Sequence, residues 1–238
     1  MKKPSGRDAH LAEQKLAVNS TARARKSHKR LFVLLYERLD NRFQRKRIMM
    51  NQDFYEAVAD NPIIAAVKNM EDVMECCKKD DIKVMFILFG DVCSIGAIVK
   101  TIKDAGKIAM VHMDLVGGLS PKEIAVEFIK EQTKADGIIS TKPALIKKAR
   151  ELSMYTVLRV FLLDSMAFEN IKQQQYSAKA DFIEVLPGVM PKVIARISHL
   201  VKTPIIAGGL ISDKEDVMGA LSAGAMAVSS TNHKVWNM

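Results

Sequence analysis

The sequence has no long apolar run, few aromatic residues and few cysteines. No apolar run approaches the ~18 residues that a bilayer-spanning helix needs, so no membrane partner is expected. The N-terminus lacks the apolar centre and small-residue cleavage site of a signal peptide, and we therefore expect a cytoplasmic protein. Aromatic residues make up 6% of the chain, which gives little basis for a surface that stacks nucleic-acid bases.

Patterns for disulfide, metal or covalent chemistry are also missing. The three cysteines include no C-x-x-C pair, and an odd number argues against a disulfide framework. The histidines fall in separate segments without metal-ligand spacing, and no nucleophile-plus-base motif is visible. We expect no metal, no cofactor and no enzymatic activity.

Positive charge is confined to the first fifth of the chain. Residues 1–49 hold 14 Lys and Arg against 4 Asp and Glu, whereas residues 50–238 hold 22 against 23. The net charge of +9 therefore belongs to a basic extension, disordered or partly helical, and the body is nearly neutral. Within the extension, Arg30–Ile48 could form an amphipathic basic helix for RNA or a membrane surface. Alternatively, Arg45–Met50 corresponds to purine-rich codons before a start, and we expect translation to begin at Met49 or Met50.

Beyond residue 60 the sequence alternates between apolar runs and helix-length segments. The apolar runs are Pro62–Val67, Lys83–Gly90, Lys107–Leu115, Asp136–Ser140, Tyr155–Asp164, Asp181–Gly188, Thr203–Gly209 and Ala225–Ser230. Such alternation predicts a parallel sheet covered on both faces. Eight units favour an α/β fold, a compact single-domain (β/α)8 TIM-type barrel over residues 50–238. An open doubly wound sheet is the rival arrangement.

Two serine–glutamate patterns predict helix starts. Ser120, followed by proline and then by Glu123, has the form of a capping box with proline at the first helical position. Ser212 and Glu215 have the same spacing. Both are stability features and carry no chemistry.

The last two apolar runs end in residues suited to binding phosphate. Gly208 and Gly209 follow one run, and Ser229 and Ser230 end the next. Loops after strands seven and eight of such barrels often hold phosphate, through main-chain N–H groups. The alternative is that the glycines only permit a tight turn.

Other polar side chains lie within or just after the apolar runs. Arg159 and Glu184 fall on neighbouring runs, where an unpaired charge would be costly, so they either pair inside the barrel or contact a ligand. His112 and Asp114 alternate onto one face, and His112 is either a core histidine or a ligand contact. Lys142 is the best candidate for a second cation facing the ligand.

Several stretches together resemble the glycerol-uptake operon antiterminator family of bacteria. They are NPIIAAVKN, HMDLVGGLS, DGIISTK, RVFLLDS, EVLPGVMP, AGGLI and AVSSTNHKVW. The resemblance covers Met50–Met238 almost end to end. It implies a barrel that responds to glycerol 3-phosphate, binds the leader mRNA of glycerol-catabolic genes, prevents premature termination and stabilises the message.

The resemblance leaves the RNA-binding surface and the oligomeric state open, and a homo-oligomer is compatible with it. Candidate RNA contacts are Lys147, Lys148 and Arg150, or Lys78 and Lys79, although such clusters are usually solvated helix faces. The basic extension could also read RNA. An enzyme acting on a small phosphorylated metabolite, with Glu184, Asp114 or Lys142 as acid–base groups, is the alternative function.

Overall fold

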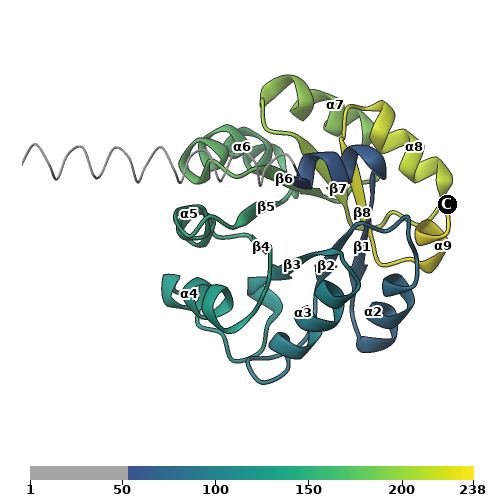
Figure 1. Ribbon diagram of the computed structural model, residues 1–238. Helices are drawn as coiled ribbons and strands as arrows, with labels where there is room; N and C mark the ends of the chain where they lie inside the picture. Colours follow the sequence, from purple (N-terminus) through teal and green to yellow (C-terminus); the bar gives the residue numbers. More distant parts are fainter. Residues whose placement is uncertain (1–52) are drawn as a thin grey trace, which may run out of the picture. The chain divides into compact units, whose positions relative to one another are not determined.

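The computed structural model (Figure 1) describes residues 53–238, and eight parallel strands in this part close into a barrel. The strands are β1 (Ile63–Val67), β2 (Val84–Ile87), β3 (Ile108–His112), β4 (Gly137–Ser140), β5 (Tyr155–Phe161), β6 (Phe182–Leu186), β7 (Ile205–Gly208) and β8 (Ala227–Ser230). Each strand pairs with the next, and β8 pairs with β1. The predicted (β/α)8 barrel is confirmed, and the open sheet is wrong because no strand edge remains unpaired. The predictions for the extension 1–49 lie outside the described residues.

Helices alternate with the strands and surround the barrel (Figure 1). They are α2 (Met70–Cys77), α3 (Ile95–Asp104), α4 (Glu123–Gln132), α5 (Pro143–Glu151), α6 (Ser165–Ala178), α7 (Pro191–Leu200), α8 (Lys214–Ser222) and α9 (His233–Trp236), with a 3-10 turn η1 (Met113–Leu115) after β3. In α3, for example, Ile95, Ile98 and Ile102 recur at helical spacing and are buried, so one face packs on the strands. Among the described residues, none of the helices combines the length and hydropathy needed to cross a bilayer.

The starts of α4 and α8 differ from the prediction. Helix α4 begins at Glu123, with Lys122 and not Ser120 at its N-cap position and no side-chain capping hydrogen bond. Helix α8 is capped by Asp213, whose side chain accepts a hydrogen bond from the N–H of Asp216. Two potential capping residues, Ser212 and Asp213, are adjacent, and the sequence pattern selected the wrong one.

The barrel interior is filled in layers of four side chains from alternate strands. The strand registers, with the stagger of one residue per strand that this fold has, define these layers. The layer nearest the carboxyl ends of the strands contains Ala66, His112, Arg159 and Gly208, and the layer beneath contains Phe86, Ile139, Glu184 and Ser229. The polar interior side chains are therefore concentrated near one end of the barrel.

The opposite end of the barrel is apolar and closed by a helix over residues 53–60. Phe54 of this helix is fully buried, and its ring lies 5.1 Å from that of Tyr155 and 4.7 Å from that of Phe182. These ring contacts add to the apolar burial that stabilises the barrel. A ligand therefore has access to the polar interior from the carboxyl ends of the strands.

Candidate ligand-binding site

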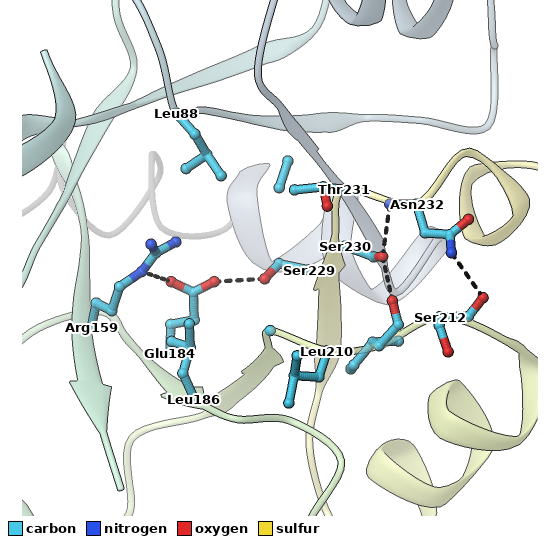
Figure 2. Close-up of a pocket in the computed structure, with 13 residues that line it drawn as sticks. Leu88, Arg159, Glu184, Leu186, Leu210, Ser212, Ser229, Ser230, Thr231 and Asn232 are labelled. Carbon is cyan, nitrogen blue, oxygen red and sulfur yellow. Dashed lines mark hydrogen bonds and ion pairs between the residues drawn. The ribbon is translucent and has the colours of Figure 1, made fainter. Parts of the chain in front are cut away.

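A cavity of about 410 Å³ opens at the carboxyl ends of the strands (Figure 2). It is lined by Ala66, Leu88, Arg159, Glu184, Leu186, Gly209, Leu210, Ile211, Ser212, Ser229, Ser230, Thr231 and Asn232. These residues come from β1, β5, β6 and β8, from the position directly after β2, and from the loops that follow β7 and β8. The volume falls in the range of ~300–1,000 Å³ that small-molecule sites occupy.

The cavity lies at a layer of the barrel where one strand carries a small residue. Ala66 of β1, which lines the cavity, stands opposite Arg159 of β5. Larger side chains fill the interior two layers below, where the four inward-facing residues are Ile64, Met110, Val157 and Ile206. The space above Glu184 and Ser229 therefore stays open to a ligand.

Glu184 lies at the bottom of the cavity, between Arg159 and Ser229 (Figure 2). The Glu184 side chain is completely buried. It accepts hydrogen bonds from Arg159 Nε at 2.6 Å and from Ser229 Oγ at 2.5 Å. The predicted Arg159–Glu184 pair is confirmed, and it offsets the cost of burying the carboxylate.

Arg159 keeps hydrogen-bonding capacity on the cavity side. Only its Nε donates to a group of the described residues, and both terminal nitrogens donate to none of them. These nitrogens are also accessible to solvent, because they are not among the buried polar atoms of the described residues that lack a hydrogen-bond partner. Up to four N–H bonds of the guanidinium are thus available to a ligand.

The glycine pair at the end of β7 has a packing role and a turn role. A Cβ on Gly208 would lie 2.6 Å from Glu184 Oε1 and 2.7 Å from Ser229 Oγ, so the buried carboxylate requires glycine there. Gly209 has a φ of +76°, a left-handed conformation that glycine adopts without steric cost. Gly209 lines the cavity and Gly208 does not.

The loops after β7 and β8 are held together by their own polar side chains. Ser230 Oγ donates to the carbonyl of Ile211 at 2.7 Å, and Asn232 Nδ2 donates to the carbonyl of Ser212 at 3.2 Å (Figure 2). Ser230 Oγ also accepts from the N–H of Asn232 at 3.0 Å. The Ser229 and Ser230 hydroxyls, predicted as phosphate ligands, are therefore engaged in positioning Glu184 and the two loops.

Main-chain donors in these loops remain available. The N–H groups of Gly209, Leu210 and Thr231 donate to no other group within residues 53–238. Leu210 has a φ of +65°, which is unusual for a bulky side chain and characteristic of functional loops. Consecutive N–H groups in left-handed backbone form concavities that bind anions.

Lys142 and Asp114 lie together, and neither is among the described residues that line the cavity. Lys142 Nζ donates to Asp114 Oδ1 at 2.6 Å, and the N–H of Thr141 donates to Asp114 Oδ2 at 2.8 Å. Burial raises the pKa of Asp114, but the hydrogen bonds from Lys142 and Thr141 outweigh it and hold the pKa below its ordinary value. Lys142 is thus committed to a carboxylate of the protein.

His112 is buried in the same layer as Arg159, with 2% of its surface exposed. Neither ring nitrogen has a hydrogen-bond partner within the described chain. Burial, and next the positive charge of Arg159, lower the pKa of His112 to about 4. The ring is therefore neutral at physiological pH.

The sequence patterns missed most of the loop residues around the cavity. Leu210, Ser212 and Asn232 line it, but Ser212 was predicted only as a helix cap, whereas Thr231 was expected in the phosphate-binding loop. The signal that could have found them is their position directly after Gly209 and Ser230, at strand ends where barrel ligands bind. In residues 53–238, no cluster of three or more His, Cys, Asp or Glu side chains could hold a metal ion.

The residues predicted to contact RNA lie on α5. Lys147 is exposed, whereas Lys148 is ion-paired with Glu127 of α4 at 2.5 Å. Arg150 is half-buried and takes part in an interaction of its own. Lys79 of the second candidate cluster contacts Glu75 at 3.4 Å, so carboxylates partly neutralise both clusters.

Comparison with known proteins gives a consistent result. Residues 63–236 match the family model described as glycerol-3-phosphate responsive antiterminator. "Uncharacterized protein YgcP" of Escherichia coli (strain K12) is 43% identical over 178 residues, which are 75% of this chain and 93% of that protein.

Solved structures of similar proteins share the barrel. The glycerol uptake operon antiterminator regulatory protein from Listeria monocytogenes is 33% identical, with a TM-score of 0.72 over 75% of this chain and 96% of that one. A glycerol uptake operon antiterminator-related protein from Thermotoga maritima is 35% identical, with a TM-score of 0.64 over 74% and 98%. Aldolases and a decarboxylase are also similar, at 18% identity or less, a level that shows the fold alone.

Proposed function

Because the chain belongs to the glycerol-3-phosphate responsive antiterminator family, we propose that it binds glycerol 3-phosphate in the cavity at the carboxyl ends of its strands. In this proposal the protein is a cytoplasmic regulator and not an enzyme. It binds the leader mRNA of glycerol-catabolic genes, prevents premature termination and stabilises the message. The ligand controls RNA binding by preferring one state of the protein, since only a difference in affinity can shift such an equilibrium.

The observation that carries the proposal is the set of unused hydrogen-bond donors around the cavity. The N–H groups of Gly209, Leu210 and Thr231 and the terminal nitrogens of Arg159 belong to residues that line it. A phosphate monoester offers several acceptor oxygens and carries about −1.5 to −2 charges, which such donors match. This arrangement keeps the loops after β7 and β8 as the phosphate site and their main-chain N–H groups as donors, without the serine hydroxyls.

The charges suggest how a phosphate ester is oriented. Glu184 is the carboxylate at the bottom of the cavity, and although Arg159 balances its charge, its oxygens can still accept hydrogen bonds. A phosphate group is repelled by a carboxylate, whereas the hydroxyl groups of glycerol donate to it. We therefore place the phosphate against the loops and the glycerol part toward Glu184.

The groups considered for acid–base catalysis are all engaged. Glu184 is paired with Arg159, and Asp114 with Lys142. A general acid or base must exchange a proton with the substrate at hydrogen-bonding distance, and ion pairing stabilises the charged form of each group instead. This supports the regulatory function over the alternative enzyme.

The experiment is calorimetric titration of the full chain with glycerol 3-phosphate, with glycerol as the phosphate-free control. Thr231→Glu places a carboxylate beside the proposed phosphate site, and the neutral Thr231→Gln, of nearly the same size, is the matched variant. We expect Thr231→Glu to weaken binding at least about tenfold relative to Thr231→Gln, because two charges ~4 Å apart near a protein surface interact by several kcal/mol.

Two results would contradict the proposal. One is the absence of saturable glycerol 3-phosphate binding by folded wild-type protein. The other is equal affinity of the two Thr231 variants, which would place the phosphate away from the loop after β8.

A further inference from the structure

His112 differs from the other polar residues of the barrel interior because its ring nitrogens make no hydrogen bond within the described residues. Among the described part of residues 53–238, its Nδ1 and Nε2 are the only buried side-chain polar atoms without a hydrogen-bond partner. Buried polar groups are almost always hydrogen-bonded, because a buried group without a partner loses its hydration and gains no hydrogen bond that compensates. An apolar side chain at this position would fill the same space without that cost.

The position of His112 points it toward the cavity. Met110 and His112 of β3 face the barrel interior, whereas Val111 between them faces the helices. His112 shares its layer with Arg159 and stands opposite Gly208, which has no side chain. The space left by Gly208 is occupied by the Glu184 carboxylate and the Ser229 hydroxyl, and these two groups line the cavity.

Two residues of the cavity lining adjoin His112 in the strand register. Leu88 directly follows β2, one register step beyond the pair Ile87 and Val111, which places it beside His112. Arg159 lies in the same layer, and its terminal nitrogens have no partner in the described chain. These nitrogens can turn toward a ligand, and the apolar Leu88 side chain is held by no hydrogen bond, so a ligand can reach the ring by displacing Leu88.

A neutral imidazole selects a particular kind of partner. One of its nitrogens donates and the other accepts a hydrogen bond. A hydroxyl group also donates and accepts, whereas a phosphate dianion only accepts. The carboxylate nearest in sequence, Asp114, is already engaged with Lys142 and does not compete for the ring.

We infer that His112 is a second ligand contact, which takes a hydroxyl group of the bound phosphate ester and thereby selects polyol phosphates over simple alkyl phosphates. The inference rests on the proposed function, because it concerns the other end of the same ligand. It assigns the loops after β7 and β8 to the phosphate and the interior layer of His112 to the polyol.

The test compares two ligands on three proteins. Glycerol 3-phosphate and n-propyl phosphate share the phosphate and the three-carbon chain, but propyl phosphate has no hydroxyl groups. The proteins are the wild type, His112→Phe, which keeps an aromatic ring without nitrogens, and His112→Gln, which restores a donor and an acceptor. Affinities are measured by titration calorimetry of the full chain.

We expect His112→Phe to lose about tenfold or more in affinity for glycerol 3-phosphate, as sites built to bond a hydroxyl do when the bond is lost. Its affinity for propyl phosphate should stay within about twofold of the wild type, and His112→Gln should recover part of the wild-type preference. An equal loss for both ligands would make His112 a structural residue, and no loss for either would remove it from the site. Both outcomes overturn the inference and leave the phosphate site standing.

A wild-type protein that binds neither ligand would instead overturn the proposed function, and the inference with it. If His112→Phe does not fold, NMR spectroscopy of the wild-type protein tests the inference instead. The ring nitrogen NMR signals of His112 should shift on adding glycerol 3-phosphate and remain unchanged with propyl phosphate. Identical spectra with the two ligands would overturn the inference.

Discussion

His112 also makes the stability of the fold depend on pH in a definite direction. Its pKa is about 4 in the folded protein and 6.5 in an ordinary environment. As the pH falls below 6.5 the unfolded chain binds a proton that the folded protein does not, so the folded state loses stability until about pH 4. Above pH 6.5 the effect is absent. The shift corresponds to about 3 kcal/mol over this window.

The measurement is urea unfolding of wild type and His112→Phe at several pH values between 4 and 7. The variant should be the more stable at the acidic end, with the difference shrinking as the pH rises. The charged groups around the ring are Arg159, Asp114 and Lys142. Of these, Asp114 has a lowered pKa and stabilises the folded state above pH ~4. The stability that Asp114 contributes is therefore lost only below the pH range in which His112 acts. Parallel pH profiles for the two proteins would show that the pKa of His112 is the same in the folded and unfolded states.

At the scale of elements, two glycines in neighbouring segments predict opposite effects of the same substitution. Gly208 ends β7, and an added Cβ would lie 2.6 Å from Glu184 Oε1, which forces the buried ion pair to move. Gly219 is inside α8, and an added Cβ would meet only the Pro191 side chain, at 3.8 Å. We expect Gly208→Ala to destabilise by about 1–3 kcal/mol and Gly219→Ala to stabilise by up to ~1 kcal/mol.

Chemical denaturation of the two variants beside the wild type is the check. Gly208→Ala should also weaken glycerol 3-phosphate binding, because Glu184 and Ser229 lie at the bottom of the cavity, whereas Gly219→Ala should leave the affinity unchanged. A stable Gly208→Ala protein with wild-type affinity would mean that the carboxylate has another position available.

The same elements show how far the sequence could predict the structure. Apolar runs at regular spacing predicted every strand of the barrel, because a strand buried on both faces leaves an unmistakable pattern. Arg159 and Glu184 could be paired in advance, since two charges in neighbouring apolar strands are costly apart. The Asp114–Lys142 contact could not be predicted from the sequence, because it depends on how η1 turns after β3. Main-chain donors after strands seven and eight were expected, but the sequence did not single out Leu210 among them, since every residue except proline has an N–H group.

At the scale of the whole molecule, the described barrel is nearly neutral, so its net charge gives no basis for the proposed RNA binding. Residues 50–238 carry 22 basic and 23 acidic side chains, and carboxylates face several of the lysines, as Glu127 faces Lys148. RNA affinity that rests on few phosphate contacts varies weakly with salt, by a slope of ~0.7 per contact on single strands. Control by the ligand must then come from a change in the state of the protein, and not from its overall charge.

Such control obeys a strict reciprocity. If glycerol 3-phosphate raises the affinity for leader RNA by some factor, RNA raises the affinity for glycerol 3-phosphate by the same factor. We expect a factor in the usual range of about 5 to 150.

The measurement titrates leader RNA with and without saturating ligand, and the ligand with and without saturating RNA, at one fixed salt concentration. Thr231→Glu, whose affinity for the ligand should be at least about tenfold lower, serves as the control and should show a smaller factor at the same ligand concentration. A factor of one in the wild type would show that the cavity does not control RNA binding. Unequal factors in the two titrations would mean that the ligand and the RNA were measured on different assemblies of the chain, since a single cycle of states cannot give both values.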